Sequence, residues 1–355
     1  MVKILESTLN TSAAKKEMLK ELDYMRCIAC IAVVIVHITA IGVTDYIHGS
    51  LPYILSLILN RSLKFTTPIF VFLSGITGFY SYRNRDIDYI PFVIKRVKKV
   101  LIPYSIWCVL YYAGYIKFGI YGFDIVFFIK SFISGNMSYH LYFVIIIIQL
   151  YILGPIFYRL IRKSNNRIML LILFAAINLL CVKYLNFKLS DRIFLKYMFF
   201  YLLGMYVTLE YNKFSSWIQN HKAIVTAGYI ISSTFYILVT YYQWKLYSSS
   251  WFLFSTISIF FVYLVGLALK DKFIRLYSFI KLFSQSSYYI YLMHPMILTA
   301  MIMITENMGI LSITKKLIIY SAVVIPVSVI LSLSYTKIKN TIKDMRKKNS
   351  ATLKV

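Results

Sequence analysis

Apolar runs of membrane-spanning length follow one another along almost the whole chain. A transmembrane helix needs about 20 mainly apolar residues to cross the hydrocarbon core. The sequence predicts ten such spans, at about 25–44, 51–80, 101–118, 140–159, 168–185, 193–210, 222–242, 250–269, 283–304 and 314–334. We expect the second to break near Pro68 into an interfacial helix and a span. Backbone groups in lipid must be satisfied internally, so the predicted fold class is an all-α, polytopic membrane protein.

Basic residues gather between the apolar runs and predict the orientation. The formal net charge is +26, but Lys and Arg lie in the connecting segments and not on one amphipathic face, so we expect no nucleic-acid partner. Cytoplasmic loops accumulate Lys and Arg, which predicts that both termini are cytoplasmic. The expected organisation is a cytoplasmic segment at 1–24, a membrane domain at 25–336 and a basic cytoplasmic tail at 337–355, with membrane lipid as the surroundings.

The four cysteines all fall inside apolar runs. Cys27 and Cys30 form a C-x-x-C pair, but no second pair and no adjacent histidine accompany it. Ordinary membrane-helix cysteines are the better interpretation, so we expect neither a disulfide nor a metal site.

Arg26 and His37 lie eleven residues apart in the first apolar run. Eleven helical steps return to within about 20° of the same face, and Asp23 falls within about 60° of it. Ionisable groups inside a bilayer cost on the order of 2.5–3.5 kcal/mol each, so they are retained mainly for a function. His37 lies deeper, where a neutral imidazole is tolerated and accepts protons. A lipid-anchoring Arg26 and a helix-packing His37 are the alternatives.

Further polar residues interrupt the later runs. Ser74 follows Pro68 in a loosened helix, and a cavity-lining role and simple helix packing are equally compatible with it. His140 opens the fourth span, and His294 precedes a proline inside the ninth, although a lone histidine is more often a packing residue. A basic stretch before the third span either binds the phosphates of a cytoplasmic donor or anchors the chain to anionic lipid. Its candidate cations are Arg83, Arg85, Lys95, Arg96 and Lys99.

Five stretches together resemble acyltransferase family 3, the integral membrane O-acyltransferases. They are L-D-Y-M-R-x10-H at 22–37, F-T-T-P-I-F-V-F-L-S-G at 65–75, F-V-I-K-R-V-K-K-V-L-I-P-Y at 92–104, H-L-Y-F at 140–143 and Y-Y-I-Y-L-M-H-P at 288–295. Within the family, the runs at 142–153 and 291–298 are similar to the intercellular-adhesion C proteins. Those proteins belong to operons for extracellular poly-N-acetylglucosamine and are regarded as O-succinyltransferases, after earlier being called exporters.

The resemblance implies transfer of an acetyl or succinyl group from cytoplasmic acyl-CoA to a hydroxyl of an exopolysaccharide or its precursor, in a biofilm setting at the cell membrane. His37 would act as the base, and Arg26 would hold the donor's phosphate or stabilise charge near the thioester. We expect the pair to point into one cavity. Ser74, His140, Tyr291 and His294 are the candidates for lining it, together with Asp23 on the Arg26 face.

Many members of this family also have an extracellular hydrolase-like domain, which is not visible in this sequence. The acceptor is therefore expected to meet the membrane domain directly or through a partner such as a polysaccharide synthase. Two other functions fit the composition. One is a polysaccharide or small-molecule transporter, and the other is a non-catalytic scaffold for a synthase complex. The sequence leaves the acyl group, the acceptor sugar and the oligomeric state open.

Overall fold

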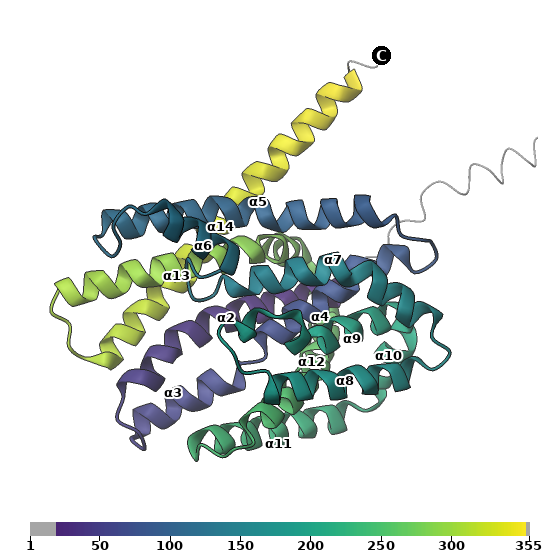
Figure 1. Cartoon of the computed structure of the whole chain (residues 1–355), viewed down its shortest axis with the longest axis horizontal. Helices are drawn as coiled ribbons and strands as arrows, with labels where there is room; N and C mark the ends of the chain where they lie inside the picture. The colour runs from purple at the N-terminus through teal and green to yellow at the C-terminus, as the bar shows by residue number, and fades with distance from the viewer. Residues whose placement is uncertain (1–18, 353–355) are drawn as a thin grey trace, which may run out of the picture.

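A computed structural model describes residues 19–352, and every regular element within them is helical. The longer helices run roughly side by side in one bundle, from which the second half of the last helix projects (Figure 1). The α-helices are α2 (Lys20–Asp45), α3 (Leu51–Ser62), α4 (Thr66–Phe79), α5 (Tyr89–Lys117), α6 (Ile125–Ser134), α7 (Tyr142–Lys163), α8 (Arg167–Tyr184), α9 (Met198–Leu209), α10 (Tyr211–Asn220), α11 (Lys222–Tyr241), α12 (Tyr247–Lys272), α13 (Tyr277–Asn307) and α14 (Ile313–Thr352). Short 3-10 turns connect them at η1 (Tyr80–Tyr82), η2 (Ser190–Arg192), η3 (Phe194–Lys196) and η4 (Ile274–Leu276). The all-α prediction is confirmed.

Eight segments in the described part of the chain are long and apolar enough to cross a membrane. They are α2, the segment from α3 to η1, α7, α8, α11, α12, the segment from η4 through α13, and α14 as far as Arg346. Two of the ten predicted spans are not among them. One is the later part of α5, which is rich in tyrosine and preceded by a basic half, and the other is α9, which has only 12 residues. The multi-pass helical architecture is confirmed, and the number ten is not.

The break in the second predicted span lies at residues 63–65 and not at Pro68. α3 ends at Ser62 and α4 starts at Thr66, so Pro68 lies in the first turn of α4. A proline is well tolerated there because the first helical N–H groups have no partner within the helix. The break leaves Lys64 between two helices, inside a segment that crosses the bundle.

α2 is the central helix and packs against α3, α4, α12, α13 and α14. Small side chains make this possible, since Ala29, Cys30 and Ala32 are almost fully buried on it. The first turns of α2 contact the first half of α13. The same half of α13 packs against the second half of α14, where Ser286 and Thr336 form a hydrogen bond of 2.8 Å. The start of α2 and the end of α14 therefore lie at the same end of the bundle. The assignment of that end to the cytoplasm remains a prediction.

The predicted basic tail continues the last membrane helix. α14 has 40 residues, and it stays helical through its charged second half as far as Thr352. The N-terminal boundary also differs slightly, because α2 starts at Lys20 within the predicted 1–24 segment. The remainder of that segment, residues 1–18, lies outside the described residues.

α4 and α9 approach each other closely at two glycines. A Cβ atom on Gly204 would lie 2.3 Å from the carbonyl oxygen of Phe72, and one on Gly75 would lie 2.4 Å from that of Tyr201. Small residues at such crossings let helix backbones meet in membranes. Because backbone atoms stand in the way, any added side chain must separate the two helices.

We expect Gly204→Ala to destabilise the protein by about 1–3 kcal/mol, the usual penalty for overpacking. The measurement is thermal unfolding in detergent. Gly78→Ala is the matched control, because a Cβ on Gly78 of α4 meets nothing within 4 Å. Equal unfolding temperatures for the two variants would contradict the close α4–α9 contact.

Candidate active site

A large cavity opens at the end of the bundle where α2 begins. Its volume is about 1080 Å³, just above the roughly 300–1,000 Å³ usual for ligand sites. Six helices line it, namely α2, α4, α5, α7, α13 and α14. We call it the basic cavity, because six of its lining side chains are cationic. They are Arg26 of α2, Arg96 and Lys99 of α5, and Lys339, Lys343 and Arg346 of α14.

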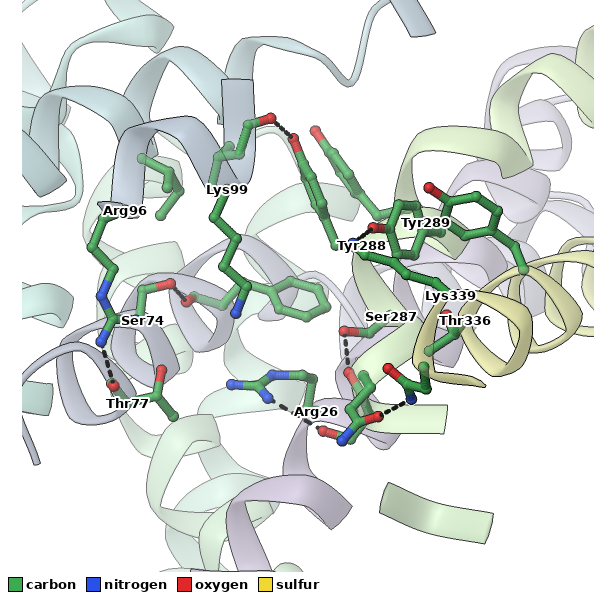
Figure 2. A pocket seen from close by; sticks show the side chains of 18 of the residues that line it. Arg26, Ser74, Thr77, Arg96, Lys99, Ser287, Tyr288, Tyr289, Thr336 and Lys339 are labelled. Atoms are coloured by element: carbon green, nitrogen blue, oxygen red, sulfur yellow. Dashed lines mark hydrogen bonds between the residues drawn. The ribbon is translucent and has the colours of Figure 1, made fainter. Parts of the chain in front are cut away.

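No Asp or Glu is found among the described residues that line the basic cavity. Arg26 and Lys99 reach into it from opposite sides, and Arg96 lies beside Thr77 (Figure 2). A cavity with several cations and no carboxylate attracts anions, and guanidinium groups suit phosphate and carboxylate oxygens particularly well.

Arg26 is positioned by a hydrogen-bonded chain that starts at Asp23. The Ser284 hydroxyl donates to Asp23 Oδ1 at 2.6 Å, and Arg26 donates to Ser284 Oγ at 3.2 Å. Tyr277 also donates to Asp23, at 2.8 Å, so this carboxylate has two partners on the α13 segment. Asp23 thereby orients Arg26 through a serine instead of neutralising it directly. Asp23 itself does not line the cavity.

Arg96 is fixed at the end of α4. Its Nη2 donates to the carbonyl oxygens of Thr77 and Gly78 at 3.0 and 2.9 Å, and its guanidinium lies over the Phe92 ring, 5.5 Å from the centroid. The last carbonyls of a helix present partial negative charge to a cation. Arg96 is thus held in place at the cavity wall.

Only part of the basic stretch before the third predicted span lines the basic cavity. Arg96 and Lys99 line the basic cavity, whereas Arg83, Arg85 and Lys95 do not. Arg83 lies over the ring of Tyr80 and Arg85 over that of Tyr82, each at 4.5 Å. Lys95 is exposed on α5. Arg83 and Arg85 precede the start of α5 at Tyr89, so they lie outside the helix that carries Arg96 and Lys99 into the cavity.

Three histidines meet deeper in the bundle, and we call His37, His140 and His294 the histidine cluster. The ring of His37 lies 5.2 Å from that of His294, and His294 lies 5.7 Å from His140. Tyr139, from the loop before α7, places its ring 4.8 Å from His37. His140 and His294 are buried, with exposed fractions of 2% and 0%. The described residues include no group of three or more His, Cys, Asp or Glu arranged to hold a metal ion.

A group of aromatic side chains links the basic cavity to the histidine cluster through Tyr291. Phe70, Phe143 and Tyr291 line the cavity, and we call them the aromatic wall. Phe143 packs against both of the others, at 6.2 Å from Phe70 and 5.6 Å from Tyr291. Tyr291 also packs against His140, at 5.0 Å, and donates its hydroxyl to the His140 carbonyl. It therefore belongs to both regions.

The expectation that Arg26 and His37 point into one cavity is not met. Arg26 lines the basic cavity, but His37 lies beyond the aromatic wall and does not. His140 and His294 do not line the cavity either, and they surround His37 instead. Tyr291 and Ser74 line it as expected. The Ser74 hydroxyl donates to the Phe70 carbonyl of its own helix at 2.8 Å.

Sequence reasoning missed two groups of residues. The sequence predicts a tail that contains Lys339, Lys343 and Arg346. Their spacings of four and three residues instead place them on one face of a continuing helix. Lys64, in the break before α4, lies near enough to His37 to interact with it electrostatically. Among the described residues Lys64 has no ion-pair or side-chain hydrogen-bond partner. The signal in the sequence that points to Lys64 is the polar middle of the second predicted span.

The fold and the site together define a multi-pass helical membrane protein with a cation-lined cavity at one end and three clustered histidines behind it. The acyltransferase domain family matches residues 19–337, and the chain belongs to this family, acyltransferase family 3.

Two relatives illustrate the similarity. The chain is 25% identical over 310 residues to the probable poly-beta-1,6-N-acetyl-D-glucosamine export protein of Staphylococcus aureus (strain Mu50 / ATCC 700699), which covers 82% of this chain and 85% of that protein. It is 27% identical over 317 residues to the protein of the same name from Staphylococcus epidermidis, covering 81% and 83%. No solved structure matches the chain significantly.

Proposed function

We propose that this protein is a membrane O-acyltransferase that moves an acetyl or succinyl group from acyl-CoA to a hydroxyl of an extracellular polysaccharide or its precursor. One observation carries the proposal furthest: a basic cavity without lining carboxylates ends at a wall behind which three histidines meet. Membership of an acyltransferase family supports the reaction class. A plasma-membrane location with the basic cavity facing the cytoplasm completes the proposal.

The basic cavity is the proposed donor site. Coenzyme A carries three phosphate groups, and the six cations of α2, α5 and α14 supply matching positive charge. The inner part of the cavity is apolar, with Phe143, Val144 and Ile147 of α7, and suits the less charged end of the donor. Arg26, oriented by Ser284 and Asp23, is the cation of the central helix that lines this cavity.

His37 is the proposed general base. It takes the proton of the sugar hydroxyl as the hydroxyl oxygen bonds to the acyl carbon; the thioester C–S bond then breaks, and the departing thiolate recovers the proton. Lys64 interacts electrostatically with His37 and is suited to stabilise the oxyanion that forms on the acyl carbon. Because Tyr291 separates the cavity from the cluster, its side chain must move before donor and acceptor meet.

The proposed acceptor is a carbohydrate. Both relatives are named for a poly-N-acetylglucosamine, which makes that polymer or its precursor the first candidate. A polysaccharide synthase is a plausible partner for delivering it. The test is transfer of radiolabel from acetyl-CoA and succinyl-CoA to poly-N-acetylglucosamine oligomers by purified protein in liposomes. Absence of transfer with both donors and with the polysaccharide synthase added would contradict the proposal.

The cations that line the cavity should contribute to donor binding more than equally basic neighbours. We expect the Arg96→Ala, Lys99→Ala double variant to raise the KM for acyl-CoA about 10- to 100-fold, since hydrogen bonds to charged groups contribute about 1.5–3 kcal/mol. Arg83→Ala, Arg85→Ala is the matched control, because it removes the same charge from the same segment outside the cavity. Equal KM values for the two variants would place the donor elsewhere.

Export is the second candidate function, because both relatives are named export proteins. Polymer appearing outside vesicles without any acyl modification would favour it. In the described structure Tyr291 lines the basic cavity and packs against Phe143 and His140, so its ring lies between the cavity and the histidine cluster. Acyl transfer that proceeds without translocation of the polymer would decide against export.

A further inference from the structure

His294 is the middle ring of the histidine cluster, and its hydrogen bonding fixes its tautomer. Nδ1 lies 3.0 Å from the carbonyl oxygen of Ile290. A carbonyl only accepts hydrogen bonds, so Nδ1 carries the proton, and Nε2 presents an unprotonated lone pair. Nε2 is buried and has no hydrogen-bond partner in the described structure, and the residue is 0% exposed. A buried acceptor without a donor is costly, so a function for it is expected.

His37 is the donor that this lone pair lacks. Its ring centroid lies 5.2 Å from that of His294, with the planes tilted by 34°. A centroid separation of about 5 Å is compatible with an N–H···N hydrogen bond of about 3 Å once two imidazole rings are turned edge to edge. Hydrogen bonds between catalytic groups are often longer before the substrate binds. Of the other two histidines, His294 is the nearer to His37, since His140 packs against His294.

We propose that His294 is a positioning residue for His37. In this proposal, which rests on the proposed function, Nε2 of His294 accepts the N–H of His37 and holds the second nitrogen of His37 unprotonated and directed at the acceptor hydroxyl. In hydrolase triads a carboxylate orients the base in the same way. Here a neutral imidazole replaces the carboxylate.

The surroundings of His37 favour this arrangement over a carboxylate partner. The titratable groups that face the cluster are Tyr139 of the loop before α7, Tyr111 of α5, Tyr291 of α13 and Lys64 of the α3–α4 break, besides the histidines themselves. None of them is a carboxylic acid. The closest acid on the same helix face, Asp23, is engaged by Ser284 and Tyr277 at the end of the bundle.

The experiment compares His294→Met with His294→Gln in the full-length protein in liposomes. Both side chains are of similar length, but only glutamine offers an oxygen near the position of Nε2. We expect His294→Met to lower kcat about 10- to 100-fold, the usual effect of losing the partner that orients a functional imidazole, with an unchanged KM for acyl-CoA. We expect His294→Gln to recover most of kcat. His48→Met, at an exposed histidine stacked on Tyr241, should behave as wild type.

A second measurement separates this proposal from the assignment of the base. In a His37→Ala background, adding His294→Met should cause no further loss, because the two residues act as a unit. Full activity in His37→Ala would refute the assigned base. Loss in His37→Ala with wild-type kcat in His294→Met would refute only the positioning role. Equal loss in folded His294→Met and His294→Gln would also refute it, with folding checked by thermal unfolding.

Discussion

Replacing His37 by alanine is expected to lower the rate of acyl transfer by about 10²- to 10⁴-fold, the range that general acid–base catalysis contributes. The acceptor hydroxyl would keep its proton during attack, so kcat should fall while the KM for acyl-CoA stays near its wild-type value. The basic cavity does not include His37, so the donor site is left intact. The measurement is a steady-state assay with labelled acyl-CoA and a carbohydrate acceptor.

His37→Gln is a useful companion variant. It keeps a polar side chain of similar length next to His294 and Tyr139, and it cannot accept a proton near neutral pH. Both variants should therefore lose rate to a similar extent and be equally well folded. Wild-type kcat in either would show that another group removes the proton.

Replacing Arg26 by alanine is expected to act on donor binding and not on proton transfer. The variant loses the one cavity-lining cation of the central helix, which a serine holds in place. We expect kcat/KM for acyl-CoA to fall about 10- to 100-fold, which corresponds to about 1.5–3 kcal/mol for hydrogen bonds to a charged group. Arg26→Lys should recover only part of this, because lysine lacks the planar fork of the guanidinium.

The control for Arg26 is Lys245→Ala, which removes a cation from the exposed loop between α11 and α12. Ser284→Ala should show an intermediate loss, because Arg26 would keep its charge but lose the partner that links it to Asp23. An Arg26→Ala variant with unchanged kcat/KM would remove this residue from the donor site.

The sequence was sufficient to predict the central helix and its polar face. A helical period places Asp23, Arg26 and His37 on one side of α2, and that side meets both the cavity and the histidine cluster. It could not reveal the partners of His37, because Tyr139 and His294 come from a loop and from α13, far along the chain. Such contacts depend on how the helices pack and not on any local pattern.

Two predictions differ from the structure for the same physical reason: the composition of a segment does not show how far a helix continues through it. The charges beyond residue 336 suggested a tail, yet their spacing continues a helix whose basic face lines the cavity. The apolar run at 193–210 suggested a full span, yet its first part forms the 3-10 turn η3 and leaves α9 only 12 residues long.

The aromatic wall has a consequence for the electrical insulation of the membrane. A wet path from the basic cavity through three imidazoles to the opposite side would let protons run down the membrane potential, which supplies about 2.3 kcal/mol per elementary charge for each 100 mV. Phe70, Phe143 and Tyr291 interrupt that path with packed rings at the point where the cavity ends. In the proposed cycle the wall opens only while donor and acceptor meet, so the membrane would stay energised between turnovers.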